Sequence, residues 1–221
     1  MGSSAFTVTT RADAHYLQVK NDLLTGRFEP GTVLLETTLG KLYGLSRTPM
    51  REALARLSHD RLIDRTERGY VVRERSAEEI EAIYEARIPL EATAAALAAR
   101  RRSRIDVDRL DHLLVMRRDE PEVTRHAEWN SDFHVAMREA ARSSIIAASL
   151  GQFDDLLTEY RPDRSAAANT ERGYQEHVAI LEAIRNGDPE AASVSMTSHL
   201  ERMRDMRIAA HVRRTTGGRR D

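Results

Sequence analysis

The sequence predicts a mostly α-helical chain in two parts: a small front part with a β-hairpin, then an all-α bundle of six or seven helices. In the front part, a short helix, a glycine and an arginine-bearing helix are followed by two β-prone runs around a second glycine. Beyond residue 76, apolar side chains recur at helical spacing almost to residue 211. The expected units are residues 1–75 and 76–212, with 213–221 as a disordered tail.

The front part opens with a helix predicted over residues 10–25, which ends at Gly26. Pro30-Gly31 marks a turn, and a short apolar-periodic helix is expected over 38–43. Gly44 can then supply the positive φ of a tight turn into the next helix.

The stretch from Ser46 to Leu57 reads S-R-T-P-M-R-E-A-L-A-R-L and predicts an amphipathic helix. Ser46 can cap its start, and Pro49 falls in the first turn, where a missing N–H is tolerated. One face is apolar, made of Met50, Ala53, Leu54 and Leu57. Arg47, Thr48 and Arg51 lie on the outer face, which suits a helix in a DNA major groove. An amphipathic surface helix with solvated arginines is the alternative.

Two β-prone runs follow, at 62–65 and 70–72, around a turn that contains Gly69. They predict a hairpin, or wing. A helix-turn-helix followed by a wing is a winged-helix domain, the fold of many DNA-binding proteins.

The second part begins with Ser76-Ala77-Glu78-Glu79, a capping box that opens a helix. Gly187, Asp188 and Pro189 suit a helix end, an N-cap and a first helical position. The predicted helices are 77–102, 105–118, 121–141, 144–160, 170–186 and 189–210.

Composition narrows the functional classes. The chain has 221 residues and no cysteine, which excludes a disulfide framework and a thiolate metal site. No apolar run approaches about eighteen residues and no signal region opens the chain, so we expect a cytoplasmic protein without a membrane partner. Residues 1–75 hold 12 Lys and Arg against 9 Asp and Glu, whereas the remainder holds 22 against 26. A mildly basic front and an acidic back fit a DNA reader joined to another domain.

Three motifs resemble those of the GntR family of bacterial transcription regulators: E-P-G-T-V-L-L-E at 29–36, L-S-R-T-P-M-R-E-A-L at 45–54 and R-G-Y-V-V at 68–72. Arg61 departs from the glycine that the family usually has after the recognition helix. The helical part is similar to the FCD domain of the FadR-like branch, through 84–91 (Y-E-A-R-I-P-L-E), 130–134 (N-S-D-F-H), 176–188 and 198–200.

This resemblance implies a homodimeric regulator that reads an inverted-repeat operator in double-stranded DNA, commonly a repressor released by its ligand. In the family, the helical domain makes the dimer and binds a small carboxylate or sugar-acid effector, usually with a divalent metal. The residues expected to contact DNA are Thr37, Ser46, Arg47, Thr48, Arg51, Arg68 and Gly69.

The spacing of the histidines allows a metal site, and the resemblance makes such a site the expected one. Asn130 and His134 are four residues apart and share a helix face. His177 and His199 lie ten residues before and twelve after Gly187, so on an antiparallel helix pair both come about 15–18 Å from the turn. The expected site takes Zn, Ni or Mn from His134, His177 and His199, with Asn130 as a weaker oxygen ligand. Three separate, hydrogen-bonded histidines are the alternative.

Asn130 stands where the family often has Asp, so the protein supplies one negative charge fewer to the metal. The resemblance also places Arg87 at the effector-binding arginine, where its guanidinium can hold a carboxylate. The alternative for Arg87 is an ordinary i,i+4 pair with Glu91.

A metal-dependent hydrolase is the second functional hypothesis, because three histidines and a water are also a hydrolytic geometry. It is disfavoured because no HExxH pairing occurs and Glu176 is expected to point away from the histidines. It would also leave the winged helix unexplained.

Overall fold

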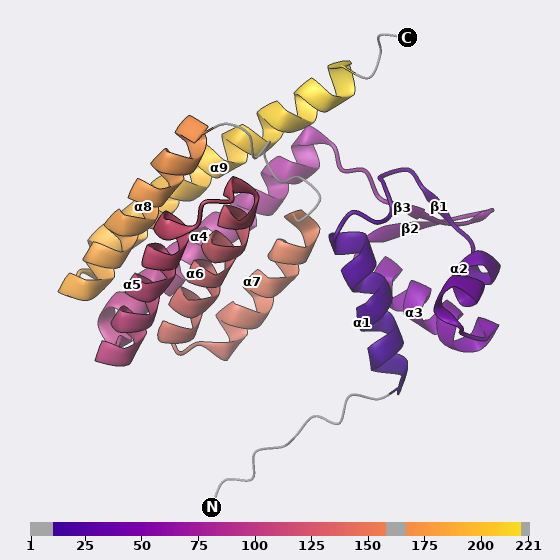
Figure 1. Cartoon of the computed structure of the whole chain (residues 1–221), viewed down its shortest axis with the longest axis horizontal. Coiled ribbons are helices and arrows are strands. Elements are labelled where there is room, and N and C mark those ends of the chain that lie inside the picture. Colours follow the sequence, from indigo (N-terminus) through magenta and orange to yellow (C-terminus); the bar gives the residue numbers. More distant parts are fainter. Residues whose placement is uncertain (1–10, 158–166, 218–221) are drawn as a thin grey trace, which may run out of the picture. The chain divides into compact units, whose positions relative to one another are not determined.

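The computed structural model describes residues 11–157 and 167–217. The chain divides between Arg75 and Ser76 into two compact units. The front unit contains α1 (Arg11–Leu24), β1 (Val33–Leu34), α2 (Glu36–Tyr43), α3 (Arg47–His59), β2 (Ile63–Thr66) and β3 (Gly69–Val72) (Figure 1).

The front unit is a winged helix, as predicted. Helix α3 packs against α1 and α2 through Met50, Ala53, Leu54 and Leu57, which are all buried. The three strands form an antiparallel sheet in the order β1-β3-β2. Strands β2 and β3 pair from Ile63 opposite Val72 to Thr66 opposite Gly69, which makes the wing a tight hairpin.

Two glycines meet particular backbone demands in this unit. Gly44 ends α2 with φ of 67°, the left-handed turn expected between the two helices. A Cβ on Gly69 would lie 3.0 Å from the carbonyl oxygen of Leu34, so glycine permits the close approach of β3 to β1. Arg61 has φ of 59°, which explains why glycine suits this position better than a residue with a side chain.

The second unit is built only of helices within its described residues (Figure 1). They are α4 (Ala77–Arg101), α5 (Arg104–Asp119), the 3-10 turn η1 (Val123–Arg125), α6 (His126–Ala140), α7 (Ser144–Leu157), α8 (Ala167–Asn186) and α9 (Pro189–Gly217). Helix α4 packs along α9 and also contacts α6, α7 and α8, so it forms the centre of the bundle. Large buried side chains of the core include Ile80, Tyr84, Phe133, Met137, Leu150, Ile180 and Met196.

Most helix boundaries agree with the predicted ones, and the caps explain why. The Ser76 side chain accepts the amide hydrogen of Glu79, whose carboxylate accepts that of Ser76. Asp188 Oδ1 accepts from the amides of Glu190 and Ala191 and so caps α9. The differences lie at helix ends: the predicted helix 121–141 begins only at 126, after η1, and the predicted helix 170–186 begins earlier, at 167. Residues 158–160 of the predicted helix 144–160 lie outside the described residues.

The tail requires a correction. Helix α9 continues to Gly217, so residues 213–217 are helical and not disordered. Residues 218–221 lie outside the described residues. Within the part of the chain that the structure describes, no helix is long and apolar enough to span a membrane.

Helix α4 contains a proline at position 89. The ring has no N–H to donate to the carbonyl of Glu85, so one hydrogen bond of the helical ladder cannot form. The hydroxyl of Thr93 donates to the carbonyl of Pro89 over 2.7 Å. Pro89 lies between Arg87 and Glu91, two charged residues that are both buried.

Candidate functional site

Three buried histidines from different helices meet inside the second unit. His134 lies on α6, His177 on α8 and His199 on α9, and one ligand nitrogen from each lies within 4.8 Å of the other two. The Nε2 atoms of His134 and His177 are 3.3 Å apart. The structure therefore brings together the three histidines that were singled out in the sequence.

The nitrogen separation suits either of two arrangements. One imidazole can donate an N–H to the other, or both can ligate one ion, since two nitrogens at about 2.1 Å from a tetrahedral metal lie roughly 3.4 Å apart. Burial lowers the pKa of all three histidines, and for His134 and His177 the neighbouring imidazoles lower it further. The rings are therefore neutral near pH 7, the form that ligates a metal.

Glu176 orients one of these rings, contrary to the prediction that it points away. Its Oε2 lies 2.8 Å from Nδ1 of His199, and Arg202 holds the same carboxylate through Nε and Nη2, each at 2.5 Å. Residues 176 and 199 approach because α8 and α9 pack together along the turn at Gly187. Although burial acts to raise it, the hydrogen bonds from His199 and Arg202 lower the pKa of Glu176 to about 2.

Asn130 lies one helical turn before His134 on α6, as expected from the sequence. Its Oδ1 is shielded from solvent and has no hydrogen-bond partner within the described residues. A buried amide oxygen without a donor is costly unless another group binds it. Three neutral imidazoles and this oxygen form a donor set that fits a divalent transition metal.

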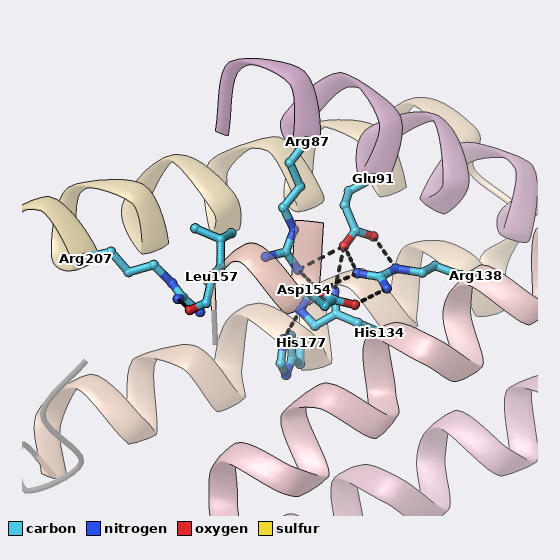
Figure 2. A network of polar contacts seen from close by, with 8 residues as sticks. All are labelled: Arg87, Glu91, His134, Arg138, Asp154, Leu157, His177 and Arg207. Atoms are coloured by element: carbon cyan, nitrogen blue, oxygen red, sulfur yellow. Dashed lines mark hydrogen bonds and ion pairs between the residues drawn. The ribbon is translucent and has the colours of Figure 1, made fainter. Parts of the chain in front are cut away.

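A charged network adjoins the histidines (Figure 2). Glu91, fully buried on α4, accepts hydrogen bonds from Arg87 of the same helix and from Arg138 of α6. Its Oε1 also lies 3.7 Å from Nδ1 of His134. Asp154 of α7 pairs with both arginines. Although burial opposes it, the hydrogen bonds that Arg138 donates to Asp154 and Glu91 raise the pKa of Arg138, so its guanidinium is charged.

Arg87 makes the ion pair that the sequence offered as one alternative, while its effector-binding role stays a prediction. It pairs with Glu91 at i+4, over 3.2 Å, and it is buried near the histidines, as an effector-binding arginine would be. Sequence reasoning missed Arg138 and Asp154. The first was detectable, because residue 138 lies four positions after His134 and shares its face of α6. No sequence signal connected Asp154 with this site.

The residues predicted to contact DNA lie in the front unit. The exposed ones are Thr37, Ser46, Arg47, Thr48, Arg51 and Arg68. Gly69 is half-buried against β1, so its close packing there accounts for a glycine at this position without a DNA contact. Arg51 Nε lies 3.4 Å from a carboxylate oxygen of Glu36. Such an exposed ion pair is weak, so a DNA phosphate or base could replace Glu36 as the partner of Arg51.

In the described helix α3, the Ser46 side chain does not make the capping hydrogen bond that the sequence predicted. Position N3 of the helix, whose amide a cap hydroxyl often binds, is occupied by Pro49, which has no N–H. The Ser46 hydroxyl is therefore exposed beside the N-terminal end of α3, an end that favours anions such as phosphate.

Comparison with known proteins agrees with this geometry. Residues 12–72 match the model of bacterial regulatory proteins of the gntR family, and residues 81–202 match the FCD domain. The HTH-type transcriptional regulator YdhC of Bacillus subtilis is 28% identical over 200 residues, which are 83% of this chain and 85% of the relative. The HTH-type transcriptional repressor GlaR of Escherichia coli is 28% identical over 198 residues, 84% and 90% of the two chains.

The fold has a close counterpart in a solved structure, E. coli McbR/YncC. It superposes with a TM-score of 0.74 at 19% identity, covering 92% of this chain and 98% of that one. A winged helix joined to an all-helical FCD domain defines a DNA-binding transcription regulator. The chain belongs to the GntR family, in the group with a C-terminal FCD domain.

Proposed function

We propose that this regulator is a repressor whose operator binding is controlled by a small carboxylate or sugar acid bound at a metal in the helical unit. The observation that carries the proposal is the placement of three buried imidazoles beside two buried arginines. The FCD match extends over all of these residues.

In the proposed site, His134, His177 and His199 hold one Zn, Ni or Mn ion and Asn130 supplies a weaker oxygen ligand. Such an ion provides a Lewis-acidic position that accepts a carboxylate oxygen. Glu176 keeps the proton of His199 on Nδ1, which leaves the lone pair of Nε2 available for a metal. The four ligands are neutral, so the two charges of the ion are not compensated by them.

That charge deficit favours an anionic effector. A carboxylate on the metal position lowers the cost of burying the ion, and Arg87 can hold a second oxygen of the same molecule. Metal and carboxylate are therefore expected to bind with positive coupling, each raising the affinity of the other by the same factor.

DNA recognition is assigned to α3 and the wing. We propose that two copies of the chain associate through their helical units and read an inverted repeat with two α3 helices. Arg47 and Arg51 contact bases or phosphates. The sugar-phosphate backbone of the DNA is contacted by Thr37, Ser46, Thr48, Arg68 and Gly69. The effector changes operator affinity only if it binds one arrangement of the dimer better than another.

A gel shift with the DNA upstream of the gene for this protein, in the presence and absence of Zn²⁺ and malonate, tests the proposal. Specific binding that malonate weakens only in the metal-loaded protein is expected. His177→Ala should keep specific DNA binding and lose the malonate effect, whereas a metal-free protein with the full malonate response would contradict the site. Light scattering of the full chain should give a dimer at tens of micromolar, and a monomer would contradict the dimer.

The hydrolase hypothesis has no specific support here. Glu176 does lie beside a histidine, but Arg202 binds its carboxylate and its pKa is about 2, which makes it a weak base. The family consists of transcription regulators, including named repressors such as GlaR.

A further inference from the structure

The two arginines beside the histidines share two carboxylates that differ in burial. The side chain of Glu91 is fully buried, whereas that of Asp154 remains 35% exposed. Glu91 also faces His134, so it is fixed between the histidines and the arginines. Asp154 approaches the arginines from α7 (Figure 2) and is more exposed to solvent than the arginines or Glu91.

Asp154 binds the arginines as an incoming carboxylate would. Its Oδ1 lies 3.0 Å from Nη2 of Arg87 and 3.2 Å from Nη2 of Arg138. Its Oδ2 accepts from Nη1 of Arg138, which completes a two-oxygen, two-nitrogen contact. This fork is the preferred geometry between a guanidinium and a carboxylate. The carboxylate position on these arginines is thus filled by the chain itself.

We propose that Asp154 is a built-in competitor, which the carboxylate of a small acid must displace from Arg87 and Arg138 to bind beside the histidines. The proposal rests on the carboxylate-effector function above. One oxygen of Glu91 lies 3.7 Å from Nδ1 of His134 and 3.2 Å from Nη2 of Arg87, so one small molecule can reach both the histidines and the arginines. The proposal therefore narrows the ligand to an acid with two anionic or metal-binding groups. Such a ligand reaches the metal position and the arginines together.

The exchange leaves the charges of the network balanced. Arg87 and Arg138 face Glu91 and Asp154, two positive and two negative groups. A ligand carboxylate replaces one negative group by another, so no guanidinium is left buried without a partner. Asp154 is already in contact with solvent. Its carboxylate can therefore turn outward and stay hydrated after the ligand has displaced it.

The exchange also acts on α7. The polar contacts of its C-terminal half include that of Asp154 with the arginines of α4 and α6, and that of the Leu157 carbonyl with Arg207 of α9 (Figure 2). Displacement of Asp154 removes the first of them. Ligand binding should therefore loosen the end of α7, although it adds contacts elsewhere in the bundle.

Calorimetric titration of the Zn²⁺-loaded full chain with malonate tests the competition. Asp154→Asn keeps the size of the side chain but removes its charge, and it should raise malonate affinity about five- to tenfold. Asp155→Asn, which removes the same charge from the adjacent position of α7, is the matched control and should change affinity less than twofold. Equal affinity of the parent chain and Asp154→Asn would refute the competition but leave the carboxylate function intact. Malonate binding to neither would refute both.

Hydrogen exchange of the unaltered chain provides a second test that needs no variant. Malonate should accelerate amide exchange in residues 150–157 while slowing it around residues 87 and 134. Asp154→Asn without malonate should show the same acceleration in α7. Slower exchange throughout α7 on malonate binding would mean that Asp154 stays in place, and would overturn the proposal.

Discussion

Replacing Glu176 by glutamine should weaken the metal site without touching a proposed ligand. The carboxylate accepts from Nδ1 of His199 over 2.8 Å and from two nitrogens of Arg202 over 2.5 Å. Arg172 also donates to it, from Nε over 3.3 Å, so each of these partners is a donor. Glutamine has one acceptor oxygen and one donor nitrogen, so it can satisfy only one side of this arrangement.

Both orientations of the amide carry a penalty. With its NH₂ toward Arg202, two donors face each other. With its NH₂ toward His199, Nδ1 must accept, which moves the ring proton to Nε2 and blocks the lone pair intended for the metal. Loss of such an orienting partner typically costs 10- to 100-fold in metal affinity, or about 1.4–2.8 kcal/mol.

Competition for Zn²⁺ against a chromophoric chelator measures this change. Glu182→Gln is the matched control, because it removes the same charge from an exposed position of α8 that pairs with Arg185. The control should bind Zn²⁺ like the parent chain. A folded Glu176→Gln protein with parental Zn²⁺ affinity would refute the orienting role.

Further outcomes follow from the same geometry. Asn130→Asp should tighten Zn²⁺ and weaken malonate in parallel titrations, because the protein then supplies the anionic charge itself; tightening of both would contradict this reasoning. Arg47→Ala or Arg51→Ala should weaken specific operator binding by about 1–3 kcal/mol if the lost contact is bidentate to guanine, as footprinting at matched salt would show. Arg61→Gly should stabilise the front unit by about 0.5–1 kcal/mol in calorimetry, since φ at this position is 59°. The pKa of Glu176 falls from 4.5 to about 2 on folding. Its stabilisation should thus be complete above pH 4.5, decline toward pH 2, and be missing from Glu176→Gln in acid unfolding of the metal-free chain.

Local signals in the sequence were sufficient for most of the fold. The Ser76 capping box and the sequence Gly187-Asp188-Pro189 define helix ends through neighbouring residues, and both occur as predicted. The apolar face of α3 is also set by local periodicity. The cap at Ser46 was predicted wrongly because a proline three residues later removed the amide that favours it.

The candidate site could be predicted only in part. Similar distances of His177 and His199 from the turn at Gly187 predicted that those rings lie together, a consequence of helix geometry. The position of Asp154 depends on how α7 packs on α4 and α6, which no short-range pattern specifies. The contact between Glu176 and His199 depends on the rotation of α8 about its own axis, which the predicted boundaries did not fix.

The proline in α4 gives this helix an uneven stiffness. A helix resists bending through its ladder of backbone hydrogen bonds, and a missing rung makes one turn more compliant than its neighbours. In α4 that turn carries Arg87 and Glu91 on either side of Pro89. The helix therefore bends most easily at the point where the proposed acid ligand would bind the guanidinium of Arg87. A small angular change there becomes a larger displacement at the helix ends, in proportion to the length of each arm.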